Sequence, residues 1–264
     1  MPACITERWL YELFPYDYPP PARETAPAGI SGSSAWRPVV TQALLVITIA
    51  IYVLQMLTQY TLGTDLPAAL GMKVNALIIN GQFYRLITPM FLHASLLHIG
   101  FNMYALFVLG VGLERFYGHG RFLAIYLLSG FAGNVLSFLM SSAPSLGAST
   151  AIFGLLGAQG VLLYHNRETF GPAARRSLMN VVTIALINLV IGLSPGIDNW
   201  GHLGGLIGGV LFAWFAGPLY APRVPGYMSS IQDERETGEV VRAGILVALL
   251  FAGLAALKVF GFLR

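Results

Sequence analysis

Charged residues are scarce in this sequence. Asp, Glu, Lys and Arg make up 10% of its 264 residues, whereas soluble domains carry about 25%. Hydrophobic residues make up 56%, and the mean hydropathy is +0.68. This composition excludes an ordinary soluble domain and predicts an all-α, polytopic membrane helix bundle.

Cysteine is almost absent, since Cys4 is the single one in the chain. Neither a disulfide framework nor a thiolate metal site can be built from it. The sequence also lacks an HExxH motif, which would place two zinc ligands on one helix face. We therefore expect no metal and no cofactor. The basic residues are scattered among loops, so we do not expect nucleic acid as a partner. The expected partner is the lipid bilayer.

Seven apolar segments follow the first 38 residues. A helix needs about 20 residues to span a bilayer, and the fourth and fifth segments are shorter than that. The segments lie at residues 39–60, 96–113, 121–140, 149–165, 178–193, 201–220 and 243–262. Residues 61–95 are too polar and too broken by Gly and Pro to span, so we expect them to pack at the interface on one side.

These segments predict four regions. Residues 1–38 form a Pro-rich tail that we expect to be cytoplasmic and weakly ordered. Residues 39–220 form a six-helix core, 221–242 a cytoplasmic linker, and 243–264 a seventh transmembrane helix.

The positions of Lys and Arg predict the orientation, because cytoplasmic loops retain these residues. With the N-terminus inside, eleven basic residues are cytoplasmic and four lie on the other side. The four are Lys73, Arg85, Lys258 and Arg264. The sequence thus favours a cytoplasmic N-terminus and an extracytoplasmic C-terminus, which brings the starts of the second, fourth and sixth helices to one outer face.

Polar side chains within a membrane are costly, so those at this outer face need an explanation. The first cluster is HASLLHIGFN, residues 93–102. His98 and Asn102 are four residues apart and share a helix face. His93 and His98 are five apart, which predicts that they point away from each other and form no metal site. The structural alternative is that these groups link helices by hydrogen bonds.

The second cluster, GASTAIFGLLG, begins at Gly147 and contains Ser149. A serine at a helix start is usually an N-cap. However, about 16 residues cover roughly 24 Å of a hydrocarbon core about 30 Å thick. Irregular backbone at such a depth requires covering protein or water. We therefore expect Ser149 to lie in a recess that water reaches.

The third cluster, DNWGHLGGLIGG, places His202 near the start of the sixth helix. Gly205 and Gly209 form a GxxxG pair, and glycines recur every three residues from 154 to 160, so the fourth and sixth helices should pack closely. That packing would bring His202 to Ser149. Phe153, on the same face as Ser149, could then stack on the imidazole. The alternative is a histidine that only packs.

A serine hydroxyl becomes a good nucleophile when a base such as a neutral imidazole takes its proton. Ser149 and His202 therefore form a candidate dyad. His98, Asn102 and the backbone N–H of Ser149 are candidate donors to an oxyanion. Asp198 is expected in the loop before the sixth helix, where it would not orient the imidazole.

These motifs resemble those of the rhomboid family of intramembrane serine proteases. The resemblance covers about residues 39–220. It rests on GxSx at Gly147–Thr150, on His202 with GxxxG, and on HxxxN at His98 and Asn102. Tyr84–Arg85 and Glu114–Gly118 are similar to further family motifs.

The resemblance implies a serine endopeptidase that cuts single-pass transmembrane proteins near the outer end of the span. The seventh helix resembles the six-plus-one arrangement of many members. Two departures are Thr150, where many members have glycine, and Phe153, where some have tyrosine.

The residues disfavour three alternatives. A catalytically inactive relative would bind membrane clients without cutting them, but such proteins usually lack the serine or the histidine. A transporter would show internal repeats, and a metal or aspartyl protease would need HExxH or two aspartates within helices.

Since the tail is no Arg-rich amphipathic transit peptide, we expect the protein to lie in a prokaryotic cell membrane.

Overall fold

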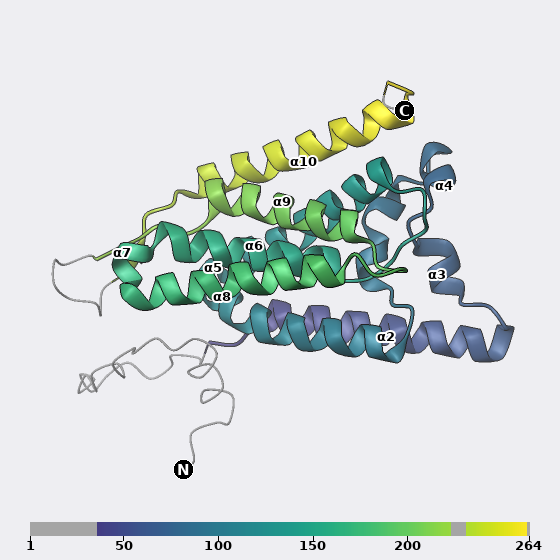
Figure 1. The fold of residues 1–264 in the computed structure, drawn as a ribbon, viewed down its shortest axis with the longest axis horizontal. Helices are drawn as coiled ribbons and strands as arrows, with labels where there is room; N and C mark the ends of the chain where they lie inside the picture. Colours follow the sequence, from purple (N-terminus) through teal and green to yellow (C-terminus); the bar gives the residue numbers. More distant parts are fainter. Residues whose placement is uncertain (1–35, 223–230, 263–264) are drawn as a thin grey trace, which may run out of the picture.

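The computed structural model describes residues 36–222 and 231–262 (Figure 1). The tail expected at residues 1–38 therefore lies outside the described residues up to position 35. The long helices lie along one common direction, with the short helices α3 and α4 at one end (Figure 1). The long helices are α2 (Val39–Leu62), α5 (Leu96–Met140), α6 (Ser149–His165), α8 (Pro172–Ile191), α9 (Asn199–Ala216) and α10 (Thr237–Val259).

Helix α5 joins the second and third expected helices. The junction is Gly118, whose backbone has φ 74° and ψ 163° and so is not helical. Glycine adopts such positive φ values without the steric cost that a Cβ imposes. Two further helices start earlier than expected, α8 at Pro172 and α10 at Thr237. Proline suits a first helical turn because its missing N–H has no partner there.

Four helices combine the length and the apolar composition that crossing a membrane requires: α2, α5, α8 and α10. Together with the remaining helices they form the expected all-α membrane bundle. The linker expected at 221–242 contains the whole of one short strand and most of another, and these two strands pair antiparallel. This pair joins β1 (Tyr220–Pro222) to β2 (Ile231–Asp233).

Helix α6 is the centre of the bundle. Its 17 residues are buried on nearly every side, between α5 and α9. By contrast, α10 buries a single stripe spaced four residues apart, and its other residues are exposed or half-buried. That stripe consists of Ala243, Val247, Phe251 and Ala255. A narrow buried stripe is typical of a helix with lipid on its other faces.

Residues 61–95 fold into short helices, as expected of a segment that does not span. They are α3 (Leu66–Gly71), α4 (Asn75–Ile79), η1 (Phe83–Leu86) and η2 (Thr88–Phe91). Arg85 fixes this segment from within. It is only 3% exposed, and its guanidinium donates to the carbonyl oxygens of Met72 at 2.7 Å and Ala69 at 3.0 Å.

Glu114 connects the first helix to the bundle. Its buried carboxylate accepts hydrogen bonds from the backbone N–H groups of Val40 and Thr41 and from the Thr41 hydroxyl. These N–H groups belong to the first turn of α2, which has no cap from its own chain segment. The Glu114 carboxylate of α5 thus accepts hydrogen bonds from N–H groups that have no partner within α2.

Candidate active site

Ser149 is the first residue of α6. The N-cap is Ala148, and it makes no side-chain capping bond, so the alternative that Ser149 serves as the N-cap is wrong. Gly147 precedes it with φ +141°, a conformation that L side chains rarely adopt. Its N–H donates to the carbonyl oxygen of Pro89 at 2.9 Å. The serine hydroxyl is therefore free to bond elsewhere.

His202 lies in the first turn of α9 and faces Ser149. The distance from His202 Nε2 to Ser149 Oγ is 3.0 Å. His202 is 9% exposed, and its other ring nitrogen, Nδ1, is buried without a hydrogen-bond partner among the described residues. The structure thus brings the two side chains within reach for proton transfer, from positions 53 residues apart.

Phe153 packs against the imidazole ring of His202. Its ring and the ring of His202 are stacked, with centroids 4.3 Å apart and an angle of 12° between their planes. Phe153 follows Ser149 by one helical turn, so one helix supplies both the hydroxyl and the ring. This stack holds a histidine whose Nδ1 has no described polar partner.

Glycines set the distance between α6 and α9. A Cβ at Gly205 would overlap the carbonyl oxygen of Thr150, and one at Gly209 would overlap that of Gly154. A Cβ at Gly157 would lie 2.9 Å from the carbonyl oxygen of Leu206. From the pair Gly205 and Thr150 to the pair Gly209 and Gly154, the positions increase together along both helices, so the helices run in the same direction and begin at the same end. Backbone contact of this kind places His202 beside Ser149.

His98 approaches the same place from α5. A Cβ added to Gly147 would lie 2.8 Å from His98 Nε2 and 3.5 Å from Ser149 Oγ. His98 Nδ1 accepts a hydrogen bond from the N–H of Ala94 at 3.4 Å. In a neutral ring the proton then belongs to Nε2, which becomes a donor beside the serine.

Asn102 lies one turn further along α5 and is 7% exposed. Its side-chain amide donates to the carbonyl oxygen of His98 at 2.8 Å. The two residues therefore share a helix face, as expected. The described contacts of Asn102 connect it to His98 and do not reach Ser149 or His202.

His93 departs from the expectation. Its ring meets that of His98, with centroids 5.0 Å apart, because His93 precedes the first residue of α5 and helical spacing does not apply to it. Burial, with a smaller contribution from the neighbouring His98, lowers the pKa of His93 to about 3. The neutral ring accepts the N–H of Ala148 through Nε2 at 3.4 Å. His93 thus supports the turn before Ser149, a role that the sequence reading missed.

Asp198 is the N-cap of α9, and its carboxylate accepts the N–H of Gly201 at 3.0 Å. It does not bond the imidazole of His202, as expected of a loop residue.

Thr150, the first departure from the resembled pattern, is 5% exposed and packs against Gly133 and Gly201. Its methyl group therefore fills a helix interface. Within residues 36–222 and 231–262, no group of three potential His, Cys, Asp or Glu metal ligands occurs.

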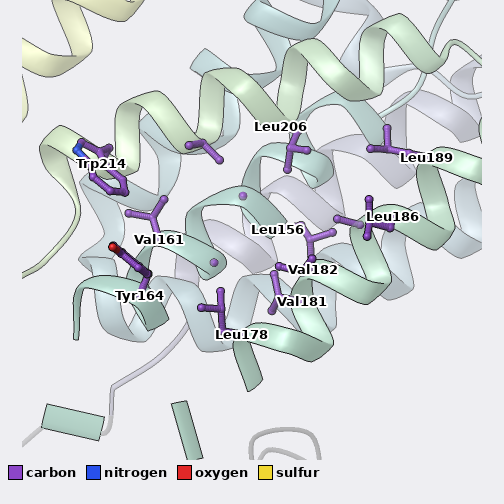
Figure 2. Close-up of a pocket in the computed structure, with 14 residues that line it drawn as sticks. Leu156, Val161, Tyr164, Leu178, Val181, Val182, Leu186, Leu189, Leu206 and Trp214 are labelled. Carbon is purple, nitrogen blue, oxygen red and sulfur yellow. The ribbon is translucent and has the colours of Figure 1, made fainter. Parts of the chain in front are cut away.

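An apolar groove, whose lining includes neither Ser149 nor His202, lies between α6, α8 and α9 (Figure 2). It has a volume of about 360 Å³. Leu156 lies in the middle of the view, Leu189 at one end, and Tyr164 and Trp214 at the other. Helix α8 packs on α6, and the groove separates much of it from α9.

Comparison with known proteins identifies the family. The Rhomboid domain model matches residues 80–219. Rhomboid protease GluP of Bacillus subtilis is 38% identical over 219 residues, which cover 83% of this chain and 41% of that protein. RHOMBOID-like protein 5 of Arabidopsis thaliana is 32% identical over 210 residues, covering 74% of this chain and 67% of that protein.

A third relative is Rhomboid-like protease 3 of Toxoplasma gondii, which is 36% identical over 133 residues. The match covers 50% of this chain and 51% of that protein. The chain thus spans roughly two fifths to two thirds of the length of these relatives. Both the domain match and the identity place it in one group: this chain belongs to the rhomboid family.

Proposed function

We propose that this chain is an intramembrane serine protease that uses a Ser149–His202 dyad. The observation that carries the proposal is the 3.0 Å distance between Ser149 Oγ and His202 Nε2, at the starts of α6 and α9. The names of two relatives, GluP and Rhomboid-like protease 3, agree with proteolysis.

In the proposed reaction, His202 Nε2 takes the proton of the Ser149 hydroxyl as its oxygen attacks a peptide carbonyl carbon. The protonated imidazole then gives this proton to the leaving amine, and the peptide C–N bond breaks. Water, activated by the same imidazole, hydrolyses the resulting ester and regenerates the serine.

The attack produces an oxyanion that needs donors already in place. His98 Nε2–H is the best placed, because it lies beside Gly147 and close to Ser149. The backbone N–H of Ser149 and the Asn102 amide are the further proposed donors, the latter after exchanging its bond to the His98 carbonyl. Removing one such donor typically lowers kcat about 100- to 1000-fold.

The proposed substrates are single-pass transmembrane proteins cut near the outer end of the span, where helix-destabilising and small residues open the backbone. The proposed location is a prokaryotic cell membrane. An unwound peptide is needed because a helical segment keeps its carbonyl groups hydrogen-bonded and shielded from attack.

Reconstitution with a model transmembrane substrate tests the function. We expect Ser149→Ala and His202→Ala each to reduce cleavage at least about 1000-fold, because the dyad acts as a unit. Ser142→Ala, which changes an exposed serine seven residues earlier, serves as the matched control and should cleave like wild type. Full cleavage by either dyad variant would contradict the mechanism.

Labelling by a fluorophosphonate probe separates nucleophile activation from substrate binding. Wild-type protein should be labelled at Ser149, and His202→Ala should be labelled far more slowly. An inactive client-binding relative would show binding of the model substrate without labelling or cleavage.

A further inference from the structure

Lys73 is a buried cation that the dyad does not use. Its side chain is fully buried, at 0% exposure, in the segment between α3 and α4. Its ammonium donates to Ser137 Oγ at 3.0 Å and to the carbonyl oxygen of Ser141 at 3.1 Å. Burying a charged ammonium is costly without such partners. The contacts with Ser137 and Ser141 therefore offset part of the cost of burying this ammonium.

The side chain of Lys73 leads to the helix that carries His202. The Ser137 hydroxyl that receives the ammonium donates in turn to Asp198 Oδ2. Asp198 caps α9 through Oδ1, and its carbonyl oxygen accepts the N–H of His202 at 3.1 Å. One chain of hydrogen bonds thus connects Lys73 to the turn that holds the imidazole.

The backbone of Lys73 leads to the segment that carries Ser149. Its N–H donates to the carbonyl oxygen of Ser145 at 2.9 Å, and the N–H of Ser145 donates back at 3.2 Å. This pairing lies four residues before Ser149. Asn75 reinforces it, since its amide donates to the carbonyl oxygen of Ser141 at 2.9 Å.

Charge favours the same connection. Burial lowers the pKa of Lys73 to about 8, while the carboxylate of Asp198 acts in the opposite direction and favours the ammonium. Lys258 of α10, the other nearby cation, lowers this pKa, but its own ammonium donates to the carbonyl oxygen of Leu139 at 2.8 Å. Asp198 is therefore the anion that the buried ammonium faces.

We infer that Lys73, Ser137 and Asp198 form a positioning network that sets the start of α9, and hence His202, relative to the segment before Ser149. The inference rests on the proposed function. None of the three side chains touches the reacting atoms. They act because a misplacement of about 1 Å can slow a reaction up to about 100-fold.

Two near-isosteric variants on one helix test the network. Ser137 and Ser129 are both fully buried on α5, eight residues apart, but the hydroxyl of Ser129 has no described hydrogen-bond partner. We expect Ser137→Ala to lower kcat and the rate of fluorophosphonate labelling about 10- to 100-fold, with KM changed less than about twofold. Ser129→Ala should leave both rates unchanged.

A lysine pair provides the second arm of the experiment. Lys73→Met should slow labelling at least as much as Ser137→Ala, and the Lys73→Met, Ser137→Ala double variant should be no slower than Lys73→Met. Lys258→Met, which removes the lysine outside the network, should label at the wild-type rate. Rates are compared per folded protein, with thermal unfolding measured alongside.

Three results would overturn the inference. Ser137→Ala could label and cleave at the wild-type rate, or it could lose activity only in proportion to unfolded protein. Effects of Lys73→Met and Ser137→Ala that multiply fully would show that they act separately. Wild-type protein that neither cleaves nor labels would instead refute the proposed function, and this inference with it.

Discussion

At the scale of single residues, the imidazole of His202 is held by apolar rather than acidic contacts. Its Nδ1 has no described partner, while its ring stacks on Phe153 with centroids 4.3 Å apart. A carboxylate bonded to that nitrogen would fix both tautomer and orientation. Here the stack and the backbone of α9 must fix the orientation together.

Phe153→Leu should therefore lower kcat by up to about tenfold, because an aromatic pair contributes about 0.5–1.5 kcal/mol that an aliphatic side chain of similar size does not replace. Phe153→Tyr keeps the ring and should retain most of the activity. Steady-state cleavage of the model substrate measures both. A leucine variant as active as wild type would show that the stack does not orient the imidazole.

At the scale of elements, the decisive contact is that of α6 with α9. Side chains are absent at the crossing, so backbone meets backbone at Gly205 and Gly209. Close approach of this kind strengthens dispersion contacts between helices in lipid, where the hydrophobic effect does not drive their association. The same approach determines how far His202 lies from Ser149.

Gly205→Ala should separate these helices, because its Cβ would overlap the carbonyl oxygen of Thr150. We expect a destabilisation of about 1–3 kcal/mol, as for other overpacked cores, together with loss of cleavage. Gly253→Ala in α10 is the control, since a Cβ there meets nothing within 4 Å. It should stabilise its helix by up to about 1 kcal/mol. Unfolding in detergent measures both, and equal stabilities of the two variants would contradict the packing argument.

At the scale of the whole molecule, the distribution of charge predicts the orientation. Three of the four basic residues expected outside make contacts within the protein: Lys73 and Arg85 are buried, and Lys258 donates to a carbonyl oxygen. The fourth, Arg264, lies outside the described residues. Among the described residues, cations that are neither buried nor internally bonded are thus few at the expected outer end, which leaves the loop arginines of the other end to act on topology.

Cysteine labelling tests this orientation. In a Cys4→Ser background, Ser142→Cys lies in the exposed loop before α6, and Glu168→Cys is exposed in α7 (Arg167–Phe170) at the opposite end. We expect a membrane-impermeant maleimide to label position 142 on intact cells and position 168 only after permeabilisation. The reverse pattern would invert the predicted topology.

The sequence by itself determined the helical membrane class and the identity of the candidate dyad. The lengths of the apolar segments predict the helices, and the small residues predict where two helices pack closely. Ser149 and His202 could therefore be paired from the sequence alone. Local rules failed where a residue lay just outside a helix. His93 is the example, because its position depends on the turn before α5.

Only the tertiary structure decided which hydrogen bonds the polar residues make. It assigned the cap of α2 to Glu114 and connected Lys73 through Ser137 to Asp198. These partners lie more than 60 residues apart in sequence, and no periodicity relates them. Their meeting depends on how the helices pack as a whole, because a buried polar group takes whichever partner the packing brings within reach.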